Sequence, residues 1–172
     1  MKKLSTIYST MLPLNMSNVD TDQIMPKQFL KRVERSGYGE FLFYDWKKEP
    51  EFPLNNKAYE GSKVLVAGDN FGTGSSREHA PWGLQDWGFD AIISTKFADI
   101  FRLNSINIGL VPIETSQENV DALFTKIYAT PSTNIEISIE NKTVQCEEIA
   151  FSFDLDDFSQ KRILEGLDKI DI

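Results

Sequence analysis

Residues 68–82 have the types and spacing of a site that binds an anion. They place Gly72 and Gly74 directly before two serines and Arg77, and they follow an apolar run at residues 63–67 that favours a buried strand. Backbone N–H groups at a strand-to-helix junction point outward, unpaired, at the positive end of the helix dipole. Glycines let a ligand approach the backbone, and an arginine adds a fork of donors that suits a carboxylate. The segment therefore predicts an anion-binding turn.

Three familiar templates for phosphate or acyl chemistry do not fit this turn. A phosphate-binding P-loop ends in Gly-Lys followed by Ser or Thr, whereas Gly74 is followed by Ser75. A dinucleotide-binding fingerprint needs a third Gly, and a nucleophile elbow needs a Gly two residues after its Ser; Arg77 stands at both positions. The residue types therefore favour a carboxylate ligand.

Two residues of the turn have structural alternatives to a role in chemistry. Ser75 and Glu78 fit a capping box for a helix that begins directly after the serine, although Pro81 suits a helix that begins near Ala80. From the residue types alone, a capping role and a catalytic role for Ser75 carry equal weight. A lone histidine such as His79 is more often a packed structural residue than a base.

The composition limits the classes of partner. The chain has 172 residues, 41% apolar and 26% charged, which fits one globular domain over residues 1–172. A net charge of −8 gives no basic face, so no nucleic-acid partner is expected. One Cys and one His cannot build a disulfide, a zinc site or an iron–sulfur site, so no metal is expected on this chain. No apolar stretch approaches the roughly 20 residues of a membrane helix, so no membrane contact is expected and a cytoplasmic location is the default.

The elements that must position the turn alternate between strands and helices. The expected strands are residues 7–14, 63–67, 91–94, 108–113, 135–139 and 143–147. The expected helices are residues 27–33, a helix that ends near Gly88, and residues 97–103, 119–129 and 158–167. Residues 34–57 lack periodicity, so we expect a loop that becomes ordered against a substrate or a partner. The pattern predicts an α/β domain with a mixed sheet.

Three motifs, in order along the chain, resemble the aconitase family in its isopropylmalate isomerase small-subunit form. Residues 71–82 resemble the serine loop of that family, and residues 18–24 with Pro26 resemble its first signature. Residues 97–101 and 109–112 resemble its third signature. The resemblance covers nearly the whole chain. It implies a swivelling β/β/α domain, with a mixed sheet flanked by helices, that closes over a cluster-bearing large subunit.

The resemblance also implies a reaction and a set of site residues. A substrate with carboxylates and a hydroxyl is dehydrated and then rehydrated at the neighbouring carbon, and a 4Fe-4S cluster on the large subunit acts as the Lewis acid. Ser75 is then the base that removes a proton, supported by helix-start N–H groups and by Arg77. Asp22 matches an acid that pairs with site residues and orients them. The implied substrate-binding residues are Gly74, Ser76, Arg77 and either Arg32 or Arg35, between which the sequence does not decide.

An isopropyl group needs an apolar wall, and the segment after Pro26 offers one. Phe29, Leu30 and Val33 are the candidates for such a specificity loop. An ordinary place in the core explains the same three residues equally well.

The implied function is that of a hydro-lyase, a 3-isopropylmalate dehydratase that interconverts 2-isopropylmalate and 3-isopropylmalate in leucine biosynthesis. The implied partners are the large subunit and a small dicarboxylate substrate, and the chain is expected to be active only with that subunit. Related hydro-lyases of the homoaconitase, citraconate or dimethylmaleate type are the alternatives within the class. A non-catalytic carboxylate-binding domain is the alternative outside it.

Overall fold

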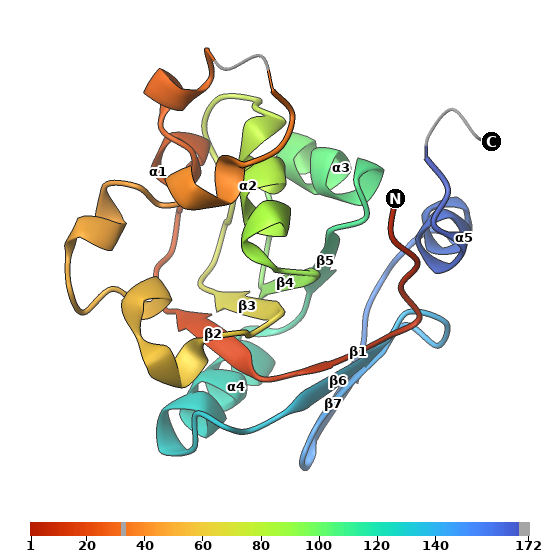
Figure 1. Cartoon of the computed structure of the whole chain (residues 1–172). Coiled ribbons are helices and arrows are strands. Elements are labelled where there is room, and N and C mark those ends of the chain that lie inside the picture. Colours follow the sequence, from red (N-terminus) through yellow and green to blue (C-terminus); the bar gives the residue numbers. More distant parts are fainter. Residues whose placement is uncertain (32–33, 169–172) are drawn as a thin grey trace.

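The computed structural model describes residues 1–31 and 34–168, and in these residues two sheets carry the fold (Figure 1). One sheet is antiparallel and has the order β1-β6-β7-β8. Its strands are β1 (Thr6–Ser9), β6 (Ile135–Ser138), β7 (Thr143–Cys146) and β8 (Ile149–Ser152). The other sheet is parallel and has the order β2-β3-β4-β5. Its strands are β2 (Met11–Leu14), β3 (Val64–Ala67), β4 (Ala91–Ser94) and β5 (Val111–Glu114).

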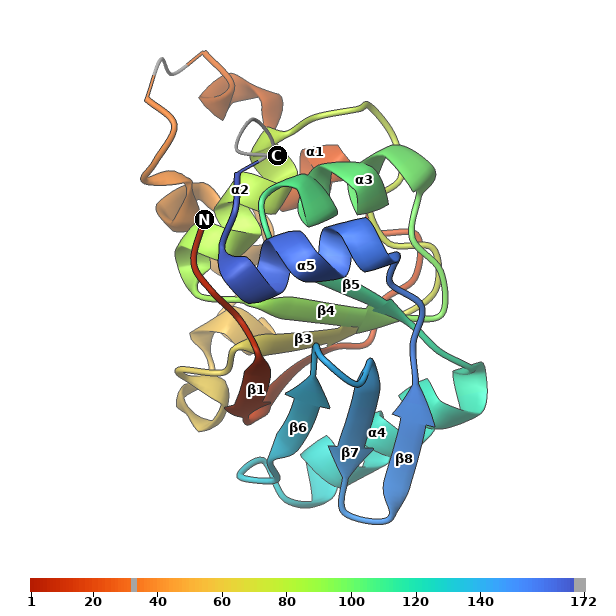
Figure 2. The same cartoon turned by 90° about the vertical axis from the view of Figure 1, so that its right-hand side faces the viewer.

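Helices cover both faces of the parallel sheet. They are α1 (Thr21–Ile24), α2 (His79–Trp87), α3 (Asp99–Asn107), α4 (Gln117–Ala129) and α5 (Asp157–Glu165). Figure 2 shows α2 and α3 on one side of the parallel sheet, and α4 with the antiparallel sheet on the other. Short 3₁₀ helices follow α1 along the chain, at Lys27–Phe29, Tyr38–Phe41, Trp46–Lys48, Pro53–Asn55 and Lys57–Tyr59.

Strand β3 shows how the parallel sheet divides the core. All four of its residues are buried, as in a strand covered on both faces. Since successive side chains of a strand point to opposite faces, Val64 and Val66 join one hydrophobic cluster and Leu65 and Ala67 join the other. The first cluster contains residues of α4 and of the antiparallel sheet. The second contains residues of α2 and of the aromatic-rich segment of 3₁₀ helices at residues 38–59, called the 3₁₀ segment below.

The predicted α/β class is confirmed, and the predicted parallel and antiparallel pairings are divided between two sheets. The prediction of one strand at residues 7–14 is wrong, because β1 pairs with β6 in one sheet and β2 pairs with β3 in the other. The chain changes sheets at Thr10, whose hydroxyl hydrogen-bonds the Ser62 hydroxyl at 2.7 Å. Strand β8 was not predicted, because its four residues alternate too briefly to stand out.

Residues 34–57, predicted as a loop that becomes ordered against a substrate or a partner, contain short 3₁₀ helices that pack on the rest of this chain. Tyr38, Leu42 and Phe43 are fully buried there, and the ring of Phe43 lies 5.6 Å from those of both Trp46 and Phe52. Burial of aromatic rings orders this segment without a strand or a long helix. The 3₁₀ helix at Tyr38–Phe41 also packs closely on α2.

A candidate active site at the carboxyl ends of the parallel strands

Three chain segments meet where β2, β3 and β4 end. Residues 71–78, called the serine loop below, lie between residues 18–21 and residues 96–98. Gly72 N donates to Val19 O at 2.8 Å, and Phe71 N donates to Lys96 O at 2.9 Å. The carboxyl ends of parallel strands share one edge of a sheet, which is where α/β proteins bind ligands. The topology therefore places the predicted anion-binding turn at the usual ligand edge.

Gly72 lets the serine loop lie against α3. Its φ is +85°, a left-handed conformation that favours glycine, and a Cβ at this position would lie 2.3 Å from Cγ of Phe101. Any larger residue would push the loop away from the helix. The glycine therefore sets the distance between the serines and the first turn of α3.

The helix after the serine loop begins later than a cap at Ser75 requires. Helix α2 starts at His79, its N-cap is Glu78, and Glu78 makes no side-chain capping hydrogen bond. The capping-box alternative for Ser75 is therefore wrong. Pro81 occupies the first turn of α2, where a missing N–H removes no helical hydrogen bond. The end of the helix at Gly88 was predicted correctly.

Thr21 holds the backbone of Ser75. Its side chain is buried, and its hydroxyl donates to the Ser75 carbonyl oxygen at 2.7 Å. Its own N–H donates to Thr73 O at 2.8 Å. Ser75 and Ser76 are exposed, so the loop is fixed through its backbone while both serine side chains face outward. Thr21 was not among the residues predicted from the sequence, although it lies within the segment that resembles the first family signature.

Arg77 and Asp22 form an ion pair at the edge of the serine loop. Arg77 Nη1 donates to Asp22 Oδ1 at 3.0 Å, and Lys27 N donates to the same oxygen at 3.1 Å. The hydrogen bond from Arg77 holds the pKa of Asp22 below its ordinary value. Within the described part of the chain, the hydrogen bonds of Arg77 use Nη1 alone, so Nη2 and Nε have no partner there. The guanidinium is thus anchored through Nη1.

The serine loop and α3 enclose a recess of about 140 Å³. It is lined by Thr21, Gly72, Gly74, Ser75, Ser76, Arg77, Ala98, Asp99, Ile100 and Phe101. Ala98 is the N-cap of α3, and its side chain makes no capping hydrogen bond. The positive end of the α3 dipole therefore lies beside Ser75. The sequence predicts helix-start N–H groups from the helix that follows the serines; in the structure, the helix start that lines the recess with Ser75 is that of α3.

His79 lies between two aromatic rings at the start of α2. Its ring centroid is 5.3 Å from that of Tyr38 and 4.6 Å from that of Trp82. Burial lowers the pKa of His79, against a smaller opposing effect of Glu78. A neutral imidazole packed in this way fits the structural role rather than proton transfer.

The remaining predicted residues either do not line the recess or lie outside the described residues. The guanidinium of Arg35 lies 4.6 Å from the ring centroid of Trp82 and lines a separate pocket. Phe29 stacks on Phe41 at 4.2 Å, and Leu30 is half-buried against the same cluster. Arg32 and Val33 lie outside the described residues.

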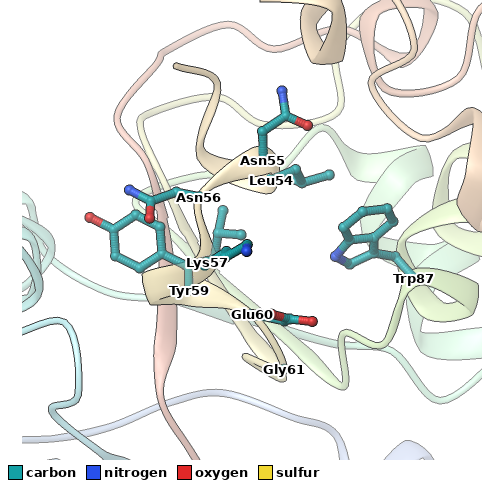
Figure 3. Close-up of a pocket in the computed structure, with 9 residues that line it drawn as sticks. Leu54, Asn55, Asn56, Lys57, Tyr59, Glu60, Gly61 and Trp87 are labelled. Atoms are coloured by element: carbon teal, nitrogen blue, oxygen red, sulfur yellow. The ribbon is translucent and has the colours of Figure 1, made fainter. Parts of the chain in front are cut away.

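A larger pocket, of about 420 Å³, contains none of the predicted site residues (Figure 3). Trp87 forms one side of it, facing Leu54 and Lys57 of the 3₁₀ segment. Within residues 1–31 and 34–168, no group of three or more His, Cys, Asp or Glu side chains is placed to hold a metal. Nor does any helix in those ranges have the length and apolar character needed to cross a membrane.

Comparison with known proteins places the chain in a family. Residues 1–118 match the aconitase C-terminal domain. The chain is 48% identical over 171 residues to the 3-isopropylmalate dehydratase small subunit of Acidobacterium capsulatum, covering 99% of this chain and 83% of that protein. It is 46% identical over 171 residues to the same subunit of Corynebacterium diphtheriae, covering 99% and 87%.

Comparison of the fold with solved structures indicates the same family. The crystal structure of 3-isopropylmalate dehydratase from Methanocaldococcus jannaschii superposes with a TM-score of 0.71 at 25% identity, covering 96% of this chain and 92% of that one. The resemblance carried by the three sequence motifs is therefore confirmed. The chain belongs to the 3-isopropylmalate dehydratase small-subunit family, whose members carry the aconitase C-terminal domain.

Proposed function

We propose that this chain is the small subunit of a hydro-lyase that interconverts 2-isopropylmalate and 3-isopropylmalate in leucine biosynthesis. The observation that carries the proposal is the arrangement around Ser75. An exposed serine, fixed through its carbonyl by Thr21, lies with Arg77 and the start of α3 in one recess. Relatives named as small subunits of this enzyme are 48% and 46% identical to this chain in alignments that cover 99% of it.

In this proposal Ser75 removes and returns the proton on the carbon beside a substrate carboxylate. A serine hydroxyl is a weak base, so its oxyanion must be stabilised by nearby donors. The uncapped first turn of α3 and the guanidinium of Arg77 line the recess that also contains Ser75. Both would stabilise a serine oxyanion in this recess, and the carboxylate of Asp99, which lines it too, acts in the opposite direction.

The proposed carboxylate clamp consists of Arg77, Ser76 and the backbone at Gly74. Arg77 is anchored by Asp22 through Nη1, which leaves a planar edge of two nitrogens for a bidentate contact. Asp22 is then a positioning residue, since it contacts the guanidinium and keeps it oriented. The second arginine remains a prediction: Arg35 lines a different pocket, and Arg32 is outside the described residues.

The recess, of about 140 Å³, is smaller than a usual ligand site, so the proposal includes a large subunit. Its iron–sulfur cluster would supply the Lewis acid for the departing hydroxyl. This chain's only cysteine, Cys146, is buried in the first core cluster, away from the serine loop. The cytoplasmic location expected from the sequence stays a prediction.

Anaerobic reconstitution tests the proposal directly. The purified chain, a cluster-loaded large subunit and the mixture are each assayed with 2-isopropylmalate, following the isopropylmaleate intermediate. Turnover is expected from the mixture only. Turnover from this chain alone, or none from a mixture in which the two subunits have associated, contradicts the proposal. A panel of homoaconitate, citramalate and dimethylmalate substrates then separates the related hydro-lyases.

Ser75→Ala tests the role of the serine. The variant is expected to lower kcat by about two to four orders of magnitude, the usual contribution of a general base. Folding and assembly should be unchanged, because only the backbone of Ser75 is held. Ser132→Ala, at another exposed serine, is the matched control. A rate for Ser75→Ala close to that of the control assigns the base to another residue.

A further inference from the structure

The exposed face of α3 carries an unusual pair of side chains. Ile100 and Leu103 are 49% and 55% exposed and lie three residues apart, hence on one side of the helix. Phe101 and Ser105 are buried on its inner side. Among the described residues, the large hydrophobic side chains with comparable exposure are aromatic or methionine, apart from this pair. Scattered exposed hydrophobics are ordinary, but two branched aliphatic side chains on one helical turn form a small apolar patch.

This patch is continuous with the proposed active site. Ile100 lines the same recess as Ser75 and Arg77, and Leu103 lies one turn farther along α3. Figure 2 shows α3 at the surface of the molecule, on the opposite side of the parallel sheet from the antiparallel sheet. Whatever closes the recess over a substrate must therefore also contact the patch.

We infer that Ile100 and Leu103 form the docking surface through which this chain closes onto its large subunit. The inference rests on the proposed function, because that function requires a second chain to complete the site. A stable interface buries roughly 800 Å² on each partner, far more than the mouth of a small recess, so the contact must extend onto a neighbouring element. Helix α3 is such a neighbour, and beside the exposed Asp99 its outer face carries the apolar side chains of Ile100 and Leu103.

The chemistry of the patch defines what the partner presents. Two aliphatic side chains with no hydrogen-bonding groups fit an apolar hollow with few charges, since a charge placed against them would lose water without gaining a partner. The exposed serines and Arg77 border the patch on the side of the substrate. The patch would thus form an apolar contact that excludes water, while the polar groups of the recess contact the ligand.

Binding of two arginine variants to the cluster-loaded large subunit tests this inference. Leu103→Arg puts a charge on the patch, and Tyr8→Arg puts the same charge at a comparably exposed position on β1, in the other sheet. Leu103→Arg is expected to raise the dissociation constant at least about tenfold, as for a central interface residue, whereas Tyr8→Arg leaves it unchanged. At saturating small subunit, kcat for Leu103→Arg should return to near the unmodified rate. Circular dichroism and a thermal melt confirm that both variants are folded.

The milder variant Ile100→Ala/Leu103→Ala gives a second measurement without a new charge. It is expected to weaken association in the same direction by a smaller factor. Unchanged association of both patch variants overturns the docking inference while leaving the proposed function intact. Failure of the unmodified pair to turn over 2-isopropylmalate, despite association, overturns the proposed function instead. If the isolated chain sediments as a dimer that Leu103→Arg makes monomeric, the patch binds a second copy of this chain and the inference is wrong.

Discussion

At the scale of single residues, the site depends on contacts made by backbone atoms as much as by the catalytic side chains. Ser75 is exposed, and what fixes it is the hydroxyl of Thr21 on its carbonyl oxygen. Arg77 is held instead through its side chain, by an ion pair with Asp22, which precedes it by 55 residues. Two adjacent residues of α1 therefore position both the proposed base and the proposed clamp.

Thr21→Val should separate positioning from stability. Valine keeps the shape of the side chain but loses the hydrogen bond to Ser75, so kcat is expected to fall about tenfold, equivalent to about 1.4 kcal/mol. KM for 2-isopropylmalate should change much less, because Arg77 is untouched. Thr21→Ser keeps the hydroxyl and should restore most of kcat. A purely structural role would lower the melting temperature of Thr21→Val while leaving kcat of the folded enzyme unchanged.

The stability of the fold should depend on pH through His79. Its titration is simple to measure, because it is the only histidine of the chain. Burial lowers its pKa in the folded state from the ordinary value of 6.5. The unfolded state therefore binds the proton more readily, and stability should be complete above pH 6.5 and decline as the pH falls toward the folded pKa. Titration of the imidazole by NMR should give a midpoint below 6.5, and His79→Phe should remove this part of the pH dependence. A midpoint above 6.5 contradicts the packing described here.

At the scale of elements, the site is assembled from the ends of three parallel strands and the start of a helix that belongs to another part of the sequence. The serine loop is bonded to residues 18–21 on one side and to residues 96–98 on the other. The close contact between Gly72 and Phe101 then sets α3 against it. Because the loop contributes no helical turn of its own before His79, its conformation depends on these neighbours.

Gly72→Ala tests the contact between the loop and α3. Alanine at φ +85° is strained and its Cβ would overlap the ring of Phe101, so a loss of about 2–4 kcal/mol of unfolding free energy is expected. Activity of the remaining folded protein should also fall, since the loop must shift. Gly61→Ala is a close control, because Gly61 has φ +81° but no atom within 4 Å of the added Cβ. Gly61→Ala should lose about 1 kcal/mol of unfolding free energy, which measures the backbone strain alone. Equal losses in the two variants would show that the approach to Phe101 is unimportant.

At the scale of the whole molecule, the parallel sheet joins two cores that share its strands. In β4, Ile93 faces the cluster with α4, and Ile92 faces the cluster with α2. Neither cluster can lose its strands without exposing the other. The chain is therefore expected to unfold as one unit, which is the test of the single domain predicted over residues 1–172.

Ile93→Val measures this coupling. The substitution removes one methylene group from the α4 side and should cost about 1 kcal/mol. Trp46 and Trp82 pack on the other cluster, so tryptophan fluorescence reports mainly from the opposite face of the sheet. A coupled molecule shifts the urea midpoint equally by fluorescence and by far-ultraviolet circular dichroism. Two separate midpoints, with only the circular dichroism shifted, would show that the two cores unfold independently.

Much of the fold was predictable where local pattern and tertiary environment agree. The apolar run that became β3, the amphipathic spacing of α4 and the Gly88 stop of α2 were all recognisable, because burial on a sheet or one helix face imposes a fixed period. The aromatic segment at residues 34–57 was not, since its order comes from rings that meet from different turns of the chain. Packing of this kind leaves no regular period in the sequence.

The proposed site residues could be named from the sequence. Two glycines, two serines and an arginine in that order predict a carboxylate-binding turn, and one cysteine with one histidine is the reason that a metal is expected on another chain. How the turn is held became visible in the fold alone. It showed that Ser75 is not a helix cap, that Thr21 fixes its backbone, and that α3 supplies the helix start beside it. These contacts join residues that are far apart in the chain. The local spacing of residue types does not indicate which distant donor hydrogen-bonds a given carbonyl oxygen.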